Sequence, residues 1–199
     1  MRDFWEARYA EPQFAYGTAP NRFLVECEPR LPRGAKVLVP GDGEGRNGAW
    51  LASCGHAVTS LDLAQSGLEK ARALAASMGV SIETVCADLA SWTPAPATYD
   101  AIVLVYLHLP PTIRRAVHRK LAASLLPGGL LILEGFERAH FGLPSGGPSN
   151  FEWLFDHDGL AEDFAGLAEL LVEQVELDLD EGTYHHGRAR VIRCLGRAT

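Results

Sequence analysis

From position 35 onward the chain alternates between two hydrophobic patterns. Short apolar runs, several of them rich in β-branched residues, predict strands, and longer segments with helical spacing predict helices. Strands are expected at 36–40, 57–63, 81–87, 101–107, 130–134, 172–179 and 189–195. Helices are expected at 3–9, 21–28, 46–54, 65–78, 112–125 and 161–171. Ser66 is a candidate cap and Gly79 the stop of helix 65–78, and Pro127-Gly128-Gly129 is expected to end helix 112–125.

Strands that alternate with helices favour a single α/β domain, residues 1–199, with a doubly wound and mostly parallel sheet. Only residues 180–188 separate the last two strands. That connection is too short for a parallel crossover, so these strands are expected to pair antiparallel. Residues 1–33 form an aromatic-rich lead-in to a core of residues 35–199. The lead-in and the Gly/Pro-rich loop 135–150 are candidates for a lid.

A glycine-rich turn, V-L-V-P-G-D-G-E-G-R-N-G, runs from Val37 to Gly48 between the first strand and a helix. Glycines let the backbone approach a ligand closely and adopt positive φ. Asp62 lies at the end of the next strand, where a carboxylate is well placed to accept hydrogen bonds from a ribose. Together these features predict an adenosine-type cofactor at the carboxyl edge of the first strands.

Two classes of cofactor fit this turn. Gly43, Gly45 and Gly48 satisfy the G-x-G-x-x-G pattern, so a nicotinamide-dependent oxidoreductase is one alternative. Asp42 and Glu44, however, are acidic, and like charges ~4 Å apart near a surface repel by about 4 kcal/mol at an effective dielectric of about 20. A pyrophosphate would meet that repulsion, whereas the cationic S-adenosylmethionine would not. The charges of the turn therefore favour S-adenosylmethionine.

The same turn resembles the first cofactor motif of class I S-adenosylmethionine-dependent methyltransferases. V-T-S-L-D-L is similar to the second motif of that family, and C-A-D-L, residues 86–89, to the third. Y-D-A-I-V and L-L-P-G-G-L-L-I-L-E look like its fourth and fifth strands. The segments F-W-E-A-R-Y, F-A-Y-G-T-A-P-N and L-D-E-G-T-Y-H-H-G-R-A, near the two ends, resemble the thiopurine, thiol and tellurite-resistance methyltransferase group.

The resemblance implies a Rossmann-like sheet of seven strands in the order 3-2-1-4-5-7-6, with strand 7 antiparallel. It implies that Asp62 binds the ribose and that Asp88 reads the adenine edge, unless Asp88 only caps its own turn. S-adenosylhomocysteine would be the product. Val39 stands where the family usually carries an acid, which keeps a non-catalytic S-adenosylmethionine-binding protein as an alternative. The implied cofactor-binding residues are Gly41, Asp42, Gly43, Gly45, Asn47, Asp62, Leu63, Asp88, Leu89 and Val105.

Candidate acceptor-binding residues lie outside these motifs. His108 follows the fourth strand at the carboxyl edge, where it could orient or deprotonate an acceptor or, equally, bond to backbone. The connection between strands six and seven should reach the same edge. It carries Tyr184, His185, His186 and Arg188. Adjacent side chains in extended chain diverge, so one histidine should face the pocket, and no metal site is expected. Phe14 and Tyr16 are candidates to cover the substrate.

Composition narrows the choice of partner. The 199 residues carry a formal net charge of −7, whereas nucleic-acid binders usually present a basic patch. The basic cluster at 114–120 suits the exposed face of a helix. No apolar run approaches the ~20 residues that span a bilayer, and the first ten residues do not resemble a signal peptide. Four scattered cysteines without a C-x-x-C pair fit a reduced cytoplasmic setting.

We therefore expect a cytoplasmic methyltransferase, monomeric or homodimeric, that acts on a small molecule and on neither nucleic acid nor membrane. In-line transfer of a methyl group from a sulfonium depends mainly on orientation. Thiols are partly ionised near neutral pH, and soft inorganic oxyanions are already charged. The expected acceptor is accordingly sulfur, selenium or tellurium in a small compound.

Overall fold

The computed structural model describes residues 1–199. The helices are α1 (Arg2–Tyr9), α2 (Arg22–Cys27), α3 (Arg46–Ser53), α4 (Gln65–Ser77), α5 (Pro111–Ala122) and α6 (His157–Asp163). The strands are β1 (Lys36–Pro40), β2 (Ala57–Asp62), β3 (Glu83–Cys86), β4 (Tyr99–Val105), β5 (Leu125–Phe136), β6 (Ala168–Glu181) and β7 (His185–Arg197). Three short 3-10 turns are η1 (Glu28–Arg30), η2 (Arg138–His140) and η3 (Phe151–Trp153).

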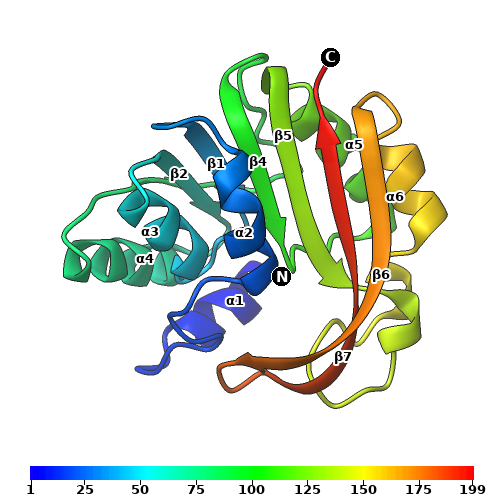
Figure 1. Ribbon diagram of the computed structural model, residues 1–199. Helices are drawn as coiled ribbons and strands as arrows, with labels where there is room; N and C mark the ends of the chain where they lie inside the picture. The colour runs from blue at the N-terminus through cyan, green and yellow to red at the C-terminus, as the bar shows by residue number, and fades with distance from the viewer.

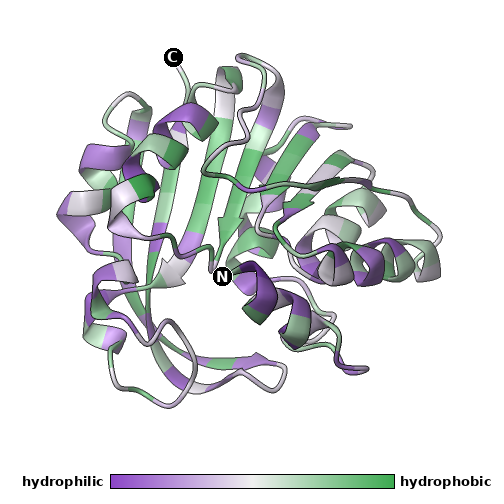
Figure 2. Ribbon diagram, turned by 180° about the vertical axis from the view of Figure 1, so that it is seen from behind, coloured by the Kyte–Doolittle hydropathy of each residue, from purple (hydrophilic) through white to green (hydrophobic).

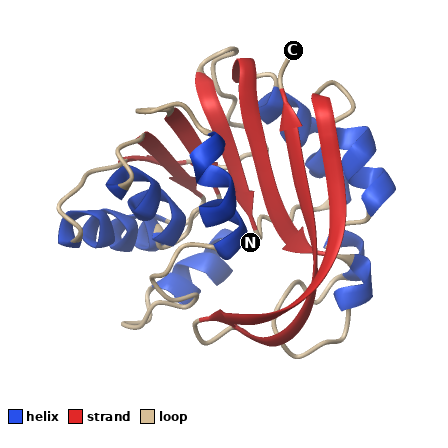
Figure 3. Ribbon diagram, in the orientation of Figure 1, coloured by secondary structure: helices blue, strands red, loops and turns tan.

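All seven strands form one sheet in the order β3-β2-β1-β4-β5-β7-β6 (Figures 1 and 3). Strands β1 to β5 are parallel, and β7 is antiparallel to both of its neighbours, β5 and β6. The predicted order and directions are confirmed. Since β6 runs the same way as the first five strands, its carboxyl end reaches the same edge of the sheet as the glycine turn.

The two faces of the sheet bury alternate residues of β4. Ile102 and Leu104 pack into the cluster that includes α5 and α6, while Ala101, Val103 and Val105 pack into the cluster that includes α2 and α3. Burial on both faces explains why this strand reads as an unbroken apolar run. Figure 2 shows that the strands in the middle of the sheet are mostly hydrophobic, whereas the helices mix hydrophilic and hydrophobic residues. None of the helices is both long enough and apolar enough to cross a membrane.

The predicted helix at 161–171 is wrong in its position. Helix α6 starts earlier, because the Asp156 side chain caps it by accepting a hydrogen bond from the Gly159 N–H at 2.9 Å. The chain then enters β6 at Ala168. Leu167 and Leu170 pack against the α5/α6 side of the core, so their apolar spacing reflects the approach to a strand rather than a helix.

The predicted junction between helix 112–125 and the fifth strand is also wrong. Helix α5 ends at Ala122, and the backbone N–H groups of Thr98 and Tyr99 bond to the Ser124 carbonyl at 2.8 and 3.0 Å. Pairing of Leu125 with Tyr99 begins β5, so Pro127-Gly128-Gly129 lies inside the strand. A neighbouring strand, rather than the glycines, ends the helix.

The last two strands extend further than predicted, and only residues 182–184 connect them. The predicted connection 180–188 is therefore mostly strand, and its side chains alternate between the two faces of a hairpin. Figure 1 shows the tips of β6 and β7 curling toward α1 at the carboxyl edge. Loop 135–150 is shorter than expected, because β5 continues to Phe136. Ser145 anchors the loop by donating to the Arg188 carbonyl at 2.5 Å.

Two smaller predictions about helices also need correction. Ser66 does not cap α4; the carboxylate of Glu6 in α1 accepts from the N–H groups of Gln65 and Ser66 at 2.8 and 3.0 Å. In α5 the basic cluster 114–120 is not all exposed. His118 is fully buried, and its Nδ1 lies 2.9 Å from the Asp163 carboxylate of α6. Both contacts tie a helix to a segment that is distant in the sequence.

Candidate active site

The glycine turn is held by close packing against two other segments of the chain. Gly41, Gly43 and Gly45 have φ of +70°, +57° and +84°, a region that L side chains rarely adopt. A Cβ on Gly45 would lie 2.4 Å from the Cβ of Ala71 in α4, and a Cβ on Gly43 would lie 2.6 Å from the Tyr9 hydroxyl. These glycines therefore allow α4 and the lead-in to approach the turn.

Asp62 organises this turn from the end of β2. One of its carboxylate oxygens accepts from the Gly43 N–H and the other from the Ala64 N–H, each at 2.9 Å. The side chain is buried, and burial raises its pKa. Each carboxylate oxygen has two lone pairs, so these bonds leave capacity for a ribose hydroxyl. The ribose-binding role remains a prediction, and positioning of the glycine turn is a second role that the sequence did not reveal.

The sequence suggested that Asp42 and Glu44, the two acidic residues of the turn, face a ligand. In the structure both side chains are already bonded within the protein. Asp42 accepts from the Ser60 hydroxyl at 2.5 Å and the Gly48 N–H at 3.3 Å, and burial raises its pKa to about 6. Glu44 pairs with Lys70 at 2.7 Å. Both charges are therefore partly neutralised within the protein. The repulsion predicted for a pyrophosphate is weaker than the sequence alone implied.

The remaining predicted cofactor residues lie along the carboxyl ends of the first four strands. Asn47 is buried in α3 and accepts from the Asn21 N–H at 2.9 Å. Leu63 follows β2, and Val105 ends β4. Asp88 is exposed and accepts from the Ala90 N–H at 2.8 Å, while the Leu89 side chain is buried. Asp88 thus caps its own turn, which does not exclude contact with an adenine. All five assignments remain predictions.

A buried polar cluster beside this turn was missed by the sequence analysis. Arg46, the first residue of α3, pairs with Glu181 at the end of β6 at 3.0 Å. The Asn21 amide, at the start of α2, donates to Glu134 of β5 at 2.6 Å and to Glu181 at 3.2 Å. The cluster therefore joins the lead-in, the glycine turn and the hairpin. Nothing in the local sequence links four residues so far apart.

His185 faces this cluster from the first position of β7. Its Nδ1 lies 3.3 Å from Glu181, and its ring is packed against Tyr16, Tyr106 and Phe136, with centroids 4.5, 4.4 and 5.1 Å away. Burial lowers the pKa of His185, which the Glu181 carboxylate partly offsets. Burial opposes the ionisation of Glu181, yet the His185 and Arg46 donors lower its pKa to about 2. His185 is therefore a neutral imidazole beside the carboxylate anion of Glu181.

Tyr106 completes the aromatic surroundings of His185. It has a φ of +52°, which is uncommon for a residue other than glycine and recurs at functional sites. Its hydroxyl lies 3.2 Å from Glu134, which also pairs with Arg193 at 2.7 Å. Burial raises the pKa of Tyr106 well above its usual value. The phenol is therefore a neutral donor to Glu134.

The neighbours of His185 on the hairpin point away from the cluster. His186 diverges as predicted: its side chain is 77% exposed and lies 3.6 Å from Asp180. Arg188 is also turned outward, where it pairs with Glu176. Tyr184 is exposed at the turn and lies under the guanidinium of Arg8, 3.7 Å from the ring centroid. His186 and Arg188 are not brought to the candidate site.

His108 does not have a free ring nitrogen. Its Nδ1 donates to the Trp153 carbonyl at 2.9 Å, and its Nε2 accepts from the Phe136 N–H at 3.1 Å. The ring stacks on Phe155 at 4.6 Å, and burial lowers its pKa to about 4. This geometry corresponds to the backbone-bonded alternative, so the predicted role as a base has no support in the structure.

The lead-in and the hairpin tip meet over the candidate site. The ring centroids of Tyr16 and Tyr184 are 6.0 Å apart, and the Tyr184 N–H bonds to the Ala15 carbonyl at 3.4 Å. A Cβ on Gly182 would lie 2.4 Å from the backbone nitrogen of Gly17, so only glycine allows this approach. Phe14, the other predicted lid residue, packs under Lys70 of α4, and no ring contact joins it to His185. Tyr16 is therefore the better-placed cover.

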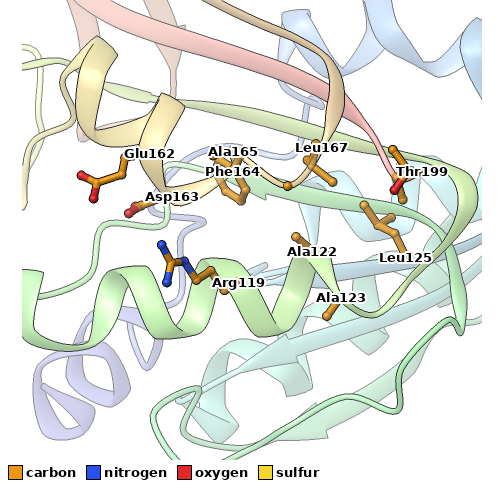
Figure 4. Close-up of a pocket in the computed structure, with 12 residues that line it drawn as sticks. Arg119, Ala122, Ala123, Leu125, Glu162, Asp163, Phe164, Ala165, Leu167 and Thr199 are labelled. Atoms are coloured by element: carbon orange, nitrogen blue, oxygen red, sulfur yellow. The ribbon is translucent and has the colours of Figure 1, made fainter.

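A separate hollow of about 470 Å³ lies at the opposite edge of the sheet (Figure 4). Its lining residues come from the end of α5, the start of β5, the region after α6 and the end of the chain. They include Arg119, Ala122, Leu125, Phe164, Leu167 and Thr199. None of these residues belongs to the glycine turn or to the hairpin tip, so this hollow is distinct from the candidate site.

Comparisons with known proteins show which family the chain belongs to. Residues 37–129, which include the glycine turn, match the family model described as a methyltransferase domain. The chain is 30% identical to thiopurine S-methyltransferase from Azotobacter vinelandii. The 166 aligned residues cover 71% of this chain and 75% of that protein.

Solved structures share the fold over the whole chain. TehB from Haemophilus influenzae is 18% identical and superposes with a TM-score of 0.72. The superposition covers 100% of this chain and 67% of TehB. A second structure comes from work on the conversion of a disulfide bond into a thioacetal group during echinomycin biosynthesis. It is 20% identical and superposes with a TM-score of 0.77, and the superposition covers 100% of this chain and 92% of that chain. The chain belongs to the class I S-adenosylmethionine-dependent methyltransferases.

Proposed function

We propose that this methyltransferase transfers a methyl group to sulfur, or to selenium or tellurium, on a small molecule that binds beside His185. The observation that carries the proposal is a neutral, inward-facing imidazole, packed between aromatic rings at the carboxyl edge of the sheet, with its Nε2 free of protein partners. The thiopurine S-methyltransferase relative supports sulfur as the acceptor atom.

The residues around the site suit S-adenosylmethionine. Its sulfonium is a cation, and the cluster offers aromatic faces from Tyr16, Tyr106 and Phe136. The glycine turn and Asp62 offer close backbone approach and acceptors for the ribose. When bound, the cofactor supplies an activated methyl group.

The protein's own contribution is orientation and proton transfer. Glu181 accepts from Nδ1 of His185, which fixes the tautomer and leaves the Nε2 lone pair available. A thiol that approaches Nε2 can transfer its proton there as its sulfur bonds to the methyl carbon and the carbon–sulfonium bond breaks. Tyr16 lies beside Tyr184 of the hairpin tip, with ring centroids 6.0 Å apart, and together they would cover the acceptor during this step. We expect a small acceptor in the cytoplasm rather than nucleic acid, in keeping with the net charge of −7.

A methylation screen with cofactor labelled in the methyl group tests the proposal. The acceptors are small thiols, selenite and tellurite, with small amines as the comparison class. We expect label to appear in methylated sulfur, selenium or tellurium products together with S-adenosylhomocysteine. Transfer only to amines, or binding of cofactor without transfer to any acceptor, would reject the proposed acceptor class.

A further inference from the structure

Arg46 carries a buried nitrogen that nothing in the chain satisfies. Its side chain is 8% exposed, and its Nη2 pairs with Glu181, but Nη1 is buried without a hydrogen-bond partner. A guanidinium has five N–H donors and stays charged at all physiological pH values. An unpaired, buried, charged donor is costly, so its retention at this place calls for a ligand that accepts from it.

The neighbours of Arg46 cannot supply that acceptor. The Glu181 carboxylate receives three donors, from Arg46 at 3.0 Å, His185 at 3.3 Å and Asn21 at 3.2 Å. Asp42, an acid of the glycine turn, is already bonded to Ser60 and Gly48, and its pKa is raised to about 6. One edge of the guanidinium is thus committed to Glu181, and the other is left for a group from outside the chain.

The position of Arg46 relates this free edge to the active site. Arg46 directly follows Gly45 of the glycine turn, and through Glu181 it is two hydrogen bonds from His185. An acceptor group held at Nη1 would therefore belong to a molecule that also reaches the glycine turn or the imidazole. Guanidinium groups bind planar carboxylates and oxyanions more strongly than neutral groups.

We propose that Arg46 binds the carboxylate or oxyanion group of a ligand in the active site through Nη1. The inference rests on the proposed function and adds to it a requirement for negative charge on a bound molecule. Two sources carry that chemistry: the amino-acid end of the cofactor, or an anionic acceptor such as a mercapto acid or selenite. The experiment has one arm for each source.

The first arm measures binding to the full chain by calorimetry. S-adenosylhomocysteine, which has the carboxylate, is compared with 5′-methylthioadenosine, which lacks it. If the cofactor is the source, Arg46→Gln weakens S-adenosylhomocysteine by about tenfold or more and leaves 5′-methylthioadenosine nearly unchanged.

The second arm uses protein saturated with S-adenosylhomocysteine and titrates mercaptoacetate against 2-mercaptoethanol, its neutral counterpart, and selenite. If the acceptor is the source, Arg46→Gln weakens mercaptoacetate and selenite by about tenfold while the neutral thiol is unaffected. An equal effect of Arg46→Gln on charged and neutral probes in both arms, or no effect in either, overturns the inference.

Glu181→Gln is the matched control, because it breaks the same ion pair and keeps the guanidinium. It should bind the anionic probes at least as tightly as the unmodified protein, since a neighbouring negative charge is removed. Equal losses in Arg46→Gln and Glu181→Gln would assign the effect to the ion pair and reject the proposal. Should Arg46→Gln fail to fold, Arg46→Lys, which keeps the charge and loses the planar fork, replaces it and must also lose the anionic probes selectively.

These readouts separate the inference from the proposed function. Binding of anions that depends on Arg46, without methyl transfer to any acceptor in the screen, would reject the proposed function and leave the Arg46 site in place. If the unmodified protein transfers methyl groups and the Arg46→Gln variant binds every probe as tightly as the unmodified protein, the proposed function stands and the Arg46 site is rejected.

Discussion

Nδ1 of His185 donates a hydrogen bond to the carboxylate of Glu181 across 3.3 Å at the turn between the last two strands. The two residues are four positions apart, at either end of a hairpin turn, so the hairpin itself creates the pair. Burial lowers the pKa of His185, and Glu181 has a pKa of about 2. Near neutral pH the imidazole is uncharged, its Nε2 lone pair is available, and the carboxylate is ionised.

This pair predicts the acid limb of the pH profile. Because the pKa of His185 lies below its ordinary value of about 6.5, protonation of Nε2 should reduce thiol methylation only as pH falls below that value. Glu181 raises the pKa of His185 by its charge, so Glu181→Gln should move the acid limb to lower pH and reduce kcat. The measurement is kcat/KM against pH for both proteins. Superimposable acid limbs would contradict a coupling between the two side chains.

Gly45→Ala should be strongly destabilising. The new Cβ would lie 2.4 Å from the Cβ of Ala71 and 2.6 Å from its Cα, and φ at this position is +84°. Both effects together should lower the free energy of unfolding by at least ~2 kcal/mol. Gly55→Ala is the control, because φ is +92° there but no atom lies within 4 Å; it should cost about 1 kcal/mol. Equal losses in urea unfolding would mean that packing of α3 on α4 does not require Gly45.

Asp42→Asn should change the pH dependence of stability. The pKa of Asp42 is about 6 in the folded protein against 3.8 for a free side chain, so the folded state binds this proton more tightly. Its contribution is fully present below about pH 4 and is lost as pH rises through 6, by roughly 3 kcal/mol in all. Asp42→Asn lacks this loss. Its free energy of unfolding in urea should therefore rise relative to that of the unmodified protein between pH 4 and pH 7. A stability difference that is constant with pH would contradict a buried carboxyl with a raised pKa.

Asp62→Asn tests the predicted ribose acceptor together with the role seen in the structure. An amide has one acceptor oxygen instead of two, so it must release either the Gly43 or the Ala64 N–H. We expect a lower Tm and an affinity for S-adenosylhomocysteine that is about tenfold weaker. Asp100→Asn is the control, because Asp100 also accepts from a backbone N–H, that of Lys36, at the opposite edge of the sheet. Unchanged affinity in a folded Asp62→Asn protein would remove Asp62 from the cofactor site.

The sequence predicted the parts of the fold that local patterns control. The seven strands, the glycine turn and the antiparallel ending follow from apolar runs, glycines and connection lengths, whereas the strand order was implied by the resemblance to class I methyltransferases. The errors lie where distant backbone decides the outcome. Ser124 bonds to the strand that starts at Tyr99, which ends α5 early, and His108 is bonded by Trp153 and Phe136, which no local pattern indicates.

The site could be predicted only in part for the same reason. Divergence of His185 and His186 follows from the period of an extended strand, and it was predicted correctly. Which of the two faces inward depends on the register of the hairpin, and the sequence alone did not determine it. Arg46, Asn21 and Glu134 meet only in three dimensions, so their cluster was not visible in the sequence.

The kinetic comparison of His185→Ala with His186→Ala tests the account most directly, because the two residues are adjacent and differ in which side of the hairpin they face. With a thiol acceptor found in the screen, His185→Ala should lower kcat/KM by about a hundredfold while its affinity for S-adenosylhomocysteine stays nearly constant. His186→Ala should match the unmodified protein to within about twofold. Full activity of the folded double variant would contradict the account, because no imidazole of the hairpin would then take part in methyl transfer.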